Sequence, residues 1–213
     1  MAEENKKEER TVSQFLEAVA SGSATPGGGS VAALAGSLGA ALVEMVANLT
    51  VGKKAFAEHE EAMKRVHEEA HAHRKALVDA VAQDVAAYEA VMEAYLLPKK
   101  TEDEKRRRKE EIQKALKKAA DPPLFTAATS LKVMKLCQEA VARGNPNAIS
   151  DAAVGALLSH AALGGGVFNV LINLSALEDK HYAATMKREL RRLEQEAEEI
   201  REQVLVKVRE KIN

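Results

Sequence analysis

Two long stretches without a charged residue, 30–43 and 152–177, constrain the fold of this chain more than any other feature. Helices that are apolar all round are buried on every side, so both stretches predict central helices rather than surface ones. In the first stretch, Ala32, Gly36 and Ala40 fall on one helical face, and such small side chains let neighbouring backbones approach closely. The sequence therefore predicts a dense centre built around two small-residue helices.

Both uncharged stretches must also be considered as membrane spans. The first is too short to cross a bilayer and is followed at once by Glu44. The second is long enough, but it carries Ser159, His160, Asn169 and Asn173, polar side chains that are costly in hydrocarbon. We therefore expect core helices of an all-helical protein and no membrane partner.

The overall composition disfavours several other partners and settings. The formal net charge is −1, aromatic residues make up 3% and Trp is absent, which argues against a nucleic-acid surface of cations and stacking rings. Cys137 is the single cysteine, so no intrachain disulfide can form, and this favours a reducing, cytoplasmic location. The charged segment 1–10 has no apolar core and is expected to be a disordered tail rather than a signal peptide.

Start and stop signals divide the remaining chain into helices, and no segment shows the two-residue alternation of a strand. Capping boxes at Thr11–Gln14 and Thr101–Glu104 open two of these helices. Ser30 is expected to cap the small-residue helix that follows the glycines. The expected helices are 11–20, 30–50, 57–97, 101–119, 121–144, one starting near 147, and 179–212. The predicted fold class is all-α, with a single multi-helix bundle domain over 11–213.

Only seven aromatic side chains are available to fill the centre of this bundle. A second copy of the chain could complete that centre, because small-residue faces pack closely against one another. We therefore expect an obligate homodimer in which long helices pair across a two-fold axis.

Three charged or reactive motifs are better explained by surface or core roles than by chemistry. HEEAH at 67–71 matches a zinc-protease pattern, but the cations Lys64 and Arg74 lie within a turn of it, so we expect a solvated helix and no metal. The KRRRK run at 105–109 is flanked by acids at i,i+4 spacing, which predicts ion pairs along a surface helix. Cys137 lies mid-helix without a patterned histidine and is expected to be buried and unreactive.

Polar residues inside apolar helices carry more information about a site. Asp84 lies among Val and Ala residues with Tyr88 one turn on, and Asn169 and Asn173 share a face of an apolar helix. Such side chains either bond one another and the backbone, or line a pocket of amides and carboxylates. The glycines of TPGGGS, 25–30, precede a helix start, where free N–H groups are either capped or available to a ligand.

Four segments occur in order along the chain: PGGGSVAALAGSLGAALVEMVANLTVGKK, LLPK, GNPNAISD and FNVLINL. Together they resemble the formiminotetrahydrofolate cyclodeaminase / methenyltetrahydrofolate cyclohydrolase family, from about Thr11 to the C-terminus. The resemblance implies an all-α homodimer that acts on one-carbon derivatives of tetrahydrofolate without a metal or redox cofactor. In animals the domain is fused behind a formiminotransferase, so a separate formiminotransferase is an implied partner of this chain.

The resemblance also implies which residues form the site. The family's catalytic acid lies fourteen residues before the proline of the LPK element, which makes it Asp84 here. Tyr88 joins the candidates because it lies one turn away. Asp151 has an alternative role, since acids near a helix N-terminus are common caps. The implied substrate-binding residues are a glycine loop, basic residues, an SD pair and two asparagines: Gly27, Gly28, Gly29, Ser30, Lys53, Lys54, Lys99, Ser150, Asp151, Asn169 and Asn173.

Three functions remain open from the sequence. The first is a cyclodeaminase that converts 5-formiminotetrahydrofolate to 5,10-methenyltetrahydrofolate and releases ammonia. The second is a cyclohydrolase that opens the methenyl compound to 10-formyltetrahydrofolate. The third is a non-enzymatic helical assembly protein in which Asp84 and the asparagines merely satisfy one another. In either enzyme, a low-dielectric helical pocket would raise the pKa of Asp84 toward neutrality and so suit it to proton transfer.

Overall fold

A computed structural model describes residues 11–212, and the tail expected at 1–10 lies outside the described residues. Residues 11–212 are almost entirely helical and contain no strand, which confirms the predicted all-α class. The elements, in chain order, are α1 Val12–Ala20, α2 Gly28–Asn48, η1 Lys54–His59, α3 Glu60–Leu96, α4 Glu102–Ala119, α5 Asp121–Arg143, η2 Pro146–Ala148, α6 Ile149–Ser175 and α7 Lys180–Ile212.

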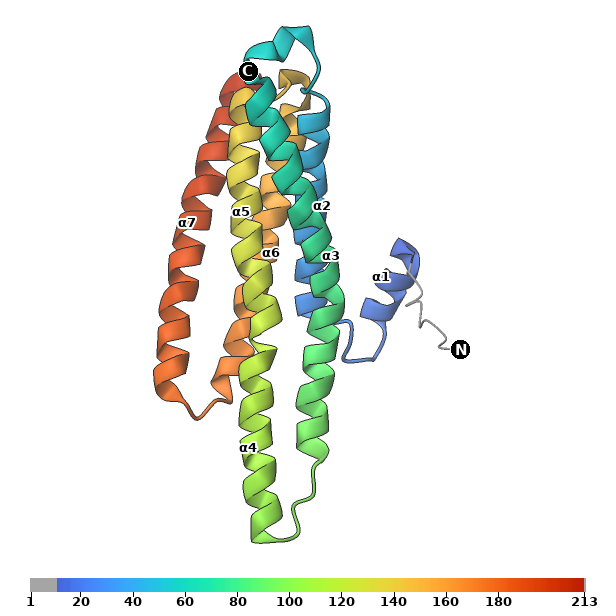
Figure 1. The fold of residues 1–213 in the computed structure, drawn as a ribbon, viewed down its shortest axis with the longest axis vertical. Helices are drawn as coiled ribbons and strands as arrows, with labels where there is room; N and C mark the ends of the chain where they lie inside the picture. The colour runs from blue at the N-terminus through green and yellow to red at the C-terminus, as the bar shows by residue number, and fades with distance from the viewer. Residues whose placement is uncertain (1–10, 213) are drawn as a thin grey trace.

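The bundle is elongated, and α2 and α6 pack against each other along their length. Helix α3 covers α2, α5 packs on α6, and α7 lies along the outside of α5 and α6 (Figure 1). Below the start of α2, about the last third of α3 runs beside α4 (Figure 1). Helix α1 projects sideways from the bundle at this level (Figure 1).

The predicted close approach of the two small-residue helices is confirmed. A Cβ added to Gly39 of α2 would lie 2.8 Å from the carbonyl oxygen of Gly155 on α6. A Cβ added to Gly165 of α6 would lie 2.8 Å from Cβ of Ala32. Since real Cβ atoms essentially never come this close to a neighbour, α2 and α6 can pack this tightly only with glycine at these positions.

Helix starts follow the sequence signals at two places and depart from them at one. Both predicted capping boxes are present, Thr11 with Gln14 and Thr101 with Glu104. The expectation that Ser30 caps α2 is wrong: α2 begins at Gly28, and its N-cap Gly27 has no side chain to offer. The hydroxyl of Ser30 instead donates to Asp84 on α3, a tertiary contact that the local sequence does not encode.

The charged motifs take surface roles, as predicted, but with different partners. In α4 the ion pairs are spaced i,i+3, as in Lys105–Glu102 at 2.7 Å, rather than i,i+4. Glu104 is engaged in the capping box and Arg108 donates to the carbonyl of Tyr95, so neither is free for the expected pairing.

The HEEAH segment lies on the surface of α3. His71 Nδ1 lies 2.9 Å from Oε1 of Glu44, and Arg74 Nε donates to the same carboxylate at 2.6 Å. No group of three or more metal-ligating side chains occurs among residues 11–212. The thiol of Cys137 is buried, and burial raises its pKa far above the usual range for a thiol, which confirms its expected burial.

Two described helical segments have the length and composition of a membrane span, Gly28–Asn48 and Pro146–Ser175. Core helices of a bundle share this composition, and α2 and α6 occupy the centre of this one. About half of the residues in the apolar part of each helix are buried within the chain, which leaves apolar side chains on an outer face.

Candidate active site

The carboxyl group of Asp84 lies against the first turn of α2. Ser30 Oγ donates to Oδ2 of Asp84 at 2.8 Å and lies 3.3 Å from the carbonyl of Val81. The backbone N–H of Ser30 lies near the same carboxyl and favours its charged form. Because the N-cap of α2 is a glycine, Asp84 supplies from α3 the acceptor that an N-cap side chain would otherwise provide.

Glycine at position 29 is a steric requirement of this contact. A Cβ on Gly29 would lie 2.1 Å from Oδ1 and 2.6 Å from Cγ of Asp84. The neighbouring Gly28 is exposed, and its Cβ would meet Nδ2 of Asn169 at an ordinary 3.5 Å. Only at position 29 is the absence of a side chain needed to make room for the Asp84 carboxyl. At position 28 a side chain would meet Asn169 at an ordinary distance.

Burial raises the pKa of Asp84 above the ordinary aspartate value, and this effect exceeds the opposing effects of the hydroxyl and N–H of Ser30. A carboxyl in this environment can hold a proton at a higher pH than a surface aspartate. That property suits a group that must accept a proton and return it in one reaction.

The raised pKa gives a prediction about stability. A folded state that raises an aspartate pKa binds more protons than the unfolded state between the ordinary and the raised value. The ionised carboxyl therefore costs stability above the raised pKa, and acidification through this window removes the cost. We expect the melting temperature of Asp84→Asn, relative to wild type, to be highest near neutral pH and to fall as the pH is lowered through that window. A difference that is constant with pH, measured by thermal denaturation in a pH series, would show that Asp84 titrates normally.

Two asparagines on α6 border the same region. Nδ2 of Asn169 donates to the carbonyl of Gly165 at 2.8 Å. Nδ2 of Asn173 donates to Ala119 on α4 at 3.1 Å and to Asn169 at 3.0 Å. Within the described residues, all of these bonds run from the side-chain nitrogens of the two asparagines to backbone carbonyl oxygens. Both Oδ1 atoms remain as acceptors for a donor on a ligand.

A groove of about 460 Å³ runs between α3 and α4, beginning one turn from Asp84 at Ala87 and reaching Leu97. Ten residues of helix correspond to about 15 Å, so the groove suits an elongated molecule. Ala119, whose carbonyl accepts from Asn173, forms part of its wall. The walls are mainly small and apolar, and charged side chains stand at the rim: Glu93, Arg107, Glu111, Lys114 and Lys118.

The structure divides the residues implied as a site into two groups. The first group surrounds the start of α2: Gly27, Gly28, Gly29, Ser30, Asp84, Tyr88, Asn169 and Asn173. Tyr88 is 40% exposed and lies one turn along α3 from Asp84. Lys99 lies two residues beyond Leu97, at the lower end of the groove.

The second group lies at the opposite end of α2 and α6. Lys53 and Lys54 follow α2, whose 21 residues correspond to about 30 Å of helix. Ser150 and Asp151 are in the first turn of α6, more than four turns before Asn169. Asp151 therefore has the helix-start position that its alternative role requires. Within one chain, the second group does not meet Asp84.

Sequence reasoning missed the part that α4 contributes. Lys114 and Lys118 stand at the rim of the groove, and Ala115 and Ala119 line its wall. The sequence does contain a pattern that could have indicated this wall: the two lysines are four residues apart, and so are the two alanines. It was overlooked because the charge-rich segment around it is typical of a solvated surface helix.

Comparisons with known proteins agree on one family. A family model described as formiminotransferase-cyclodeaminase matches residues 11–192. A methenyltetrahydrofolate cyclohydrolase from Methylorubrum extorquens is 42% identical over 203 residues, covering 95% of this chain and 98% of that protein. The formimidoyltransferase-cyclodeaminase of Sus scrofa is 37% identical over 183 residues, and the match spans 86% of this chain but only 34% of the pig protein. A crystal structure of a formiminotetrahydrofolate cyclodeaminase from Thermotoga maritima superposes with a TM-score of 0.87 at 32% identity, covering 97% of this chain and 99% of that one.

Proposed function

Because the chain belongs to the formiminotransferase-cyclodeaminase family, we propose that it is a folate one-carbon enzyme in which Asp84 transfers the proton. The observation that carries this proposal is the position of Asp84, a carboxyl with a raised pKa beside two asparagines at the upper end of an elongated groove. No metal or redox cofactor is required by the chemistry described below. The single, buried thiol of Cys137 supports a cytoplasmic location.

As a cyclodeaminase, the enzyme closes a five-membered ring. N10 of 5-formiminotetrahydrofolate attacks the formimino carbon on N5, and the Asp84 carboxylate accepts the proton that N10 loses. The formimino group enters protonated, so after the attack its nitrogen already carries two hydrogens. The same carboxyl then returns the N10 proton to this nitrogen, which leaves as ammonia while the positively charged methenyl bridge forms. Holding N10 against the carbon contributes much of the rate increase, because the reaction becomes a positioned intramolecular attack.

The groove and the asparagines fit the two ends of such a substrate. The pterin has an edge of amide and amine groups, which the free Oδ1 atoms of Asn169 and Asn173 can pair with. The aminobenzoyl-glutamate portion extends along the groove between α3 and α4. Its carboxylates then approach the cations Arg107 and Lys99 toward the lower end.

Cyclohydrolase activity is the second candidate, and the nearly full-length, 42% identical relative of that name favours it. In this reaction water attacks the methenyl carbon and Asp84 accepts one proton from the water. The carboxyl returns this proton to N5 as the bond between N5 and the carbon breaks, and the remaining hydroxyl proton is released to solvent as the 10-formyl group forms. The residues and the groove are the same for both reactions, and only the attacking atom differs. One site therefore accounts for both relatives' names.

Two assays on the purified protein decide between the candidates. In the first, 5-formiminotetrahydrofolate is supplied, and the absorbance of the methenyl product and free ammonia are followed together. In the second, the loss of methenyltetrahydrofolate is measured against its spontaneous hydrolysis. Ammonia release equal to methenyl formation identifies the cyclodeaminase, and accelerated loss of methenyl absorbance alone identifies the cyclohydrolase. Activity in neither assay, with protein that is folded, would exclude both.

We also propose that the active form is a homodimer that pairs through the outer surface of α2 and α6, here called the dimer face. On α2, Val31, Leu38 and Met45 recur every seven residues and are 39%, 51% and 37% exposed. On α6, Phe168 and Ile172 are 72% and 68% exposed. An apolar face of this extent is typical of an interaction surface. The exposed residues on α2 extend equally to both sides of Leu38, which suits the self-complementary surface of a two-fold dimer.

An antiparallel packing of the two α2 helices, centred near Leu38, would also bring together the two separated groups of implied site residues. It places the far end of α2 in one copy beside the start of α2 in the other. Lys53 and Lys54 of the second copy then lie near the Gly27–Gly29 segment of the first. In this arrangement, both groups of implied site residues serve the same substrate.

A further inference from the structure

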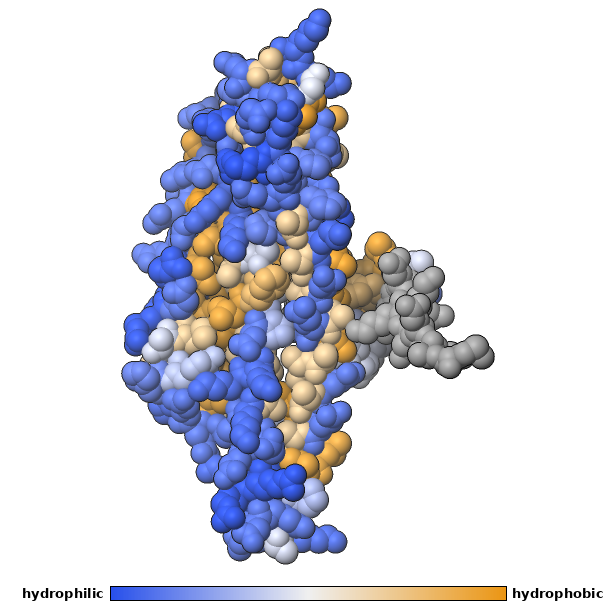
Figure 2. Space-filling view, in the orientation of Figure 1, coloured by the Kyte–Doolittle hydropathy of each residue, from blue (hydrophilic) through white to orange (hydrophobic). Residues whose placement is uncertain are grey.

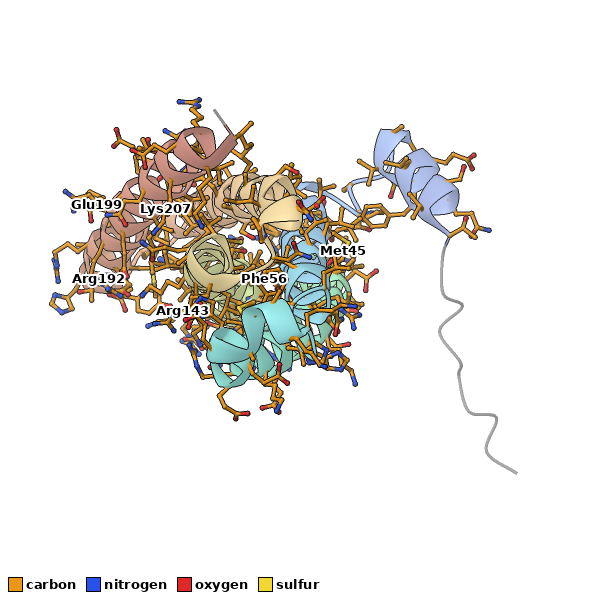
Figure 3. All side chains as sticks on the ribbon, turned by 90° about the horizontal axis from the view of Figure 1, so that it is seen from above. Met45, Phe56, Arg143, Arg192, Glu199 and Lys207 are labelled. Atoms are coloured by element: carbon orange, nitrogen blue, oxygen red, sulfur yellow. The ribbon has the colours of Figure 1, made fainter. Side chains whose placement is uncertain are left out.

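Helix α1 has a complete apolar face that its own bundle covers only in part: Phe15 and Val19 are half-buried, and no residue of the helix is fully buried. Val12, Phe15, Leu16 and Val19 follow the i, i+3, i+4, i+7 spacing of a helix that packs on a surface. Val12 is 75% exposed and Leu16 is 60% exposed. Figures 1 and 3 show α1 standing clear of the bundle, beyond α2.

A nine-residue helix is not stable in water on its own. Isolated helices shorter than about 12–15 residues are marginal even in favourable sequences, because most helix stability in proteins comes from packing an apolar face. The capping box of Thr11 and Gln14 contributes only about 1 kcal/mol. Another surface must therefore cover α1 if it is to remain helical in solution.

The position of α1 indicates which surface this is. Met45, a residue of the dimer face, lies on the side of the bundle from which α1 projects (Figure 3). Figure 2 shows hydrophobic residues along the edge of the bundle next to α1. Val31, another residue of the dimer face, lies in the first turn of α2, at the level from which α1 projects (Figure 1). A body that covers the whole dimer face therefore reaches α1.

We propose that α1 is an exchanged arm that packs its apolar face on the second copy of the chain. The proposal rests on the proposed dimer, whose two-fold axis makes the exchange reciprocal. The polar residues of α1 include Glu17 and no Lys or Arg, whereas helices that lie on anionic membranes are rich in cations. A second copy is therefore a better partner for α1 than a lipid surface.

The exchange also connects dimer formation to the site. The seven residues 21–27 join α1 to α2, and Pro26 within this segment is buried. The segment ends at Gly27, two residues before Gly29, the glycine that contacts Asp84. A docked arm holds this segment at both ends, so loss of docking is expected to raise KM for the folate substrate more than it lowers kcat.

Photo-crosslinking of the full-length protein tests the exchange. A benzoylphenylalanine in place of Leu16, on the apolar face, is compared with one in place of Ser13, on the polar face. We expect irradiation of the Leu16 protein to give a product of twice the 23.0 kDa chain mass, and the Ser13 protein to give several-fold less. A Leu16 product that stays at the mass of one chain would overturn the proposal, because α1 would then pack on its own bundle. A monomeric wild type in sedimentation would overturn it as well.

A charge substitution provides a second, independent test. We expect Phe15→Asp/Leu16→Asp to weaken the dimer at least tenfold in sedimentation experiments, with Ser13→Asp as the matched control that leaves it unchanged. A double variant that dimerises as tightly as wild type would contradict the exchange. Crosslinking and sedimentation need no folate, so an exchanged arm in a protein without folate activity would leave this inference standing while the proposed function fails.

Discussion

Replacement of Gly29 by alanine is expected to lower kcat by about a hundredfold or more in whichever folate assay the wild type is active. A Cβ at this position would lie 2.1 Å from Oδ1 of Asp84, so the carboxyl must move away from the first turn of α2. The 2.8 Å bond from Ser30 is then lost, and the proton-transfer group no longer faces the reacting atoms. Positioned acid–base groups typically contribute 10²–10⁴-fold, and forcing a methyl group into a filled space costs about 1–3 kcal/mol of stability.

The adjacent glycine supplies the matched control. Gly28→Ala adds the same methyl group one residue earlier, where it meets Asn169 at an ordinary 3.5 Å, so kcat should stay within a few-fold of wild type. Gly22→Ala, where a Cβ meets nothing within 4 Å, controls for loop stiffening. A Gly29→Ala protein that is folded by circular dichroism and keeps the kcat of wild type would show that the contact between Gly29 and Asp84 is not required.

Replacement of Leu38 by aspartate is expected to convert the protein to a monomer. Leu38 is 51% exposed in the single chain and lies at the centre of the dimer face. In the proposed two-fold arrangement, the two introduced carboxylates would be near each other and removed from water, which is costly for unpaired charges. We expect the dissociation constant to rise at least a hundredfold, equivalent to about 2.8 kcal/mol.

Sedimentation velocity over a dilution series measures this effect. Val206→Asp on α7 is the matched control, since Val206 is 45% exposed but lies outside the dimer face. Because residues from the second copy are proposed to complete the site, the Leu38→Asp protein should also lose specific activity on dilution. A Leu38→Asp protein that remains dimeric and fully active would rule out this surface as the interface.

Much of the fold could be predicted because its signals are local. Both capping boxes and the prolines that open α5 lie where the sequence placed them, since each depends on neighbours within one turn. The start of α2 could not be placed correctly. Serine is a preferred N-cap residue, but the hydroxyl of Ser30 donates to Asp84, which lies 54 residues away in the sequence.

The sequence predicts which residues belong to the site, but it does not predict how far apart they lie in the fold. Motif order along the chain gave Asp84 and Asn169 without indicating that Lys53 and Ser150 lie at the other end of the bundle. A pattern of residue types carries no distances, and long helices separate their ends by tens of ångströms. The three glycines were likewise indistinguishable until the carboxyl of Asp84 was seen against Gly29 alone.

The central claim is that Asp84 is the proton-transfer group of a folate one-carbon enzyme. The most direct test compares initial rates of wild type, Asp84→Asn and the exposed control Asp79→Asn with both folate substrates, alongside equilibrium binding of tetrahydrofolate. Asparagine keeps an oxygen that can accept from Ser30 but cannot carry the proton. For Asp84→Asn we therefore predict unchanged folding and a tetrahydrofolate dissociation constant within a few-fold of wild type. We predict that kcat falls 10²–10⁴-fold for Asp84→Asn only. Turnover by Asp84→Asn at the wild-type rate would contradict the claim.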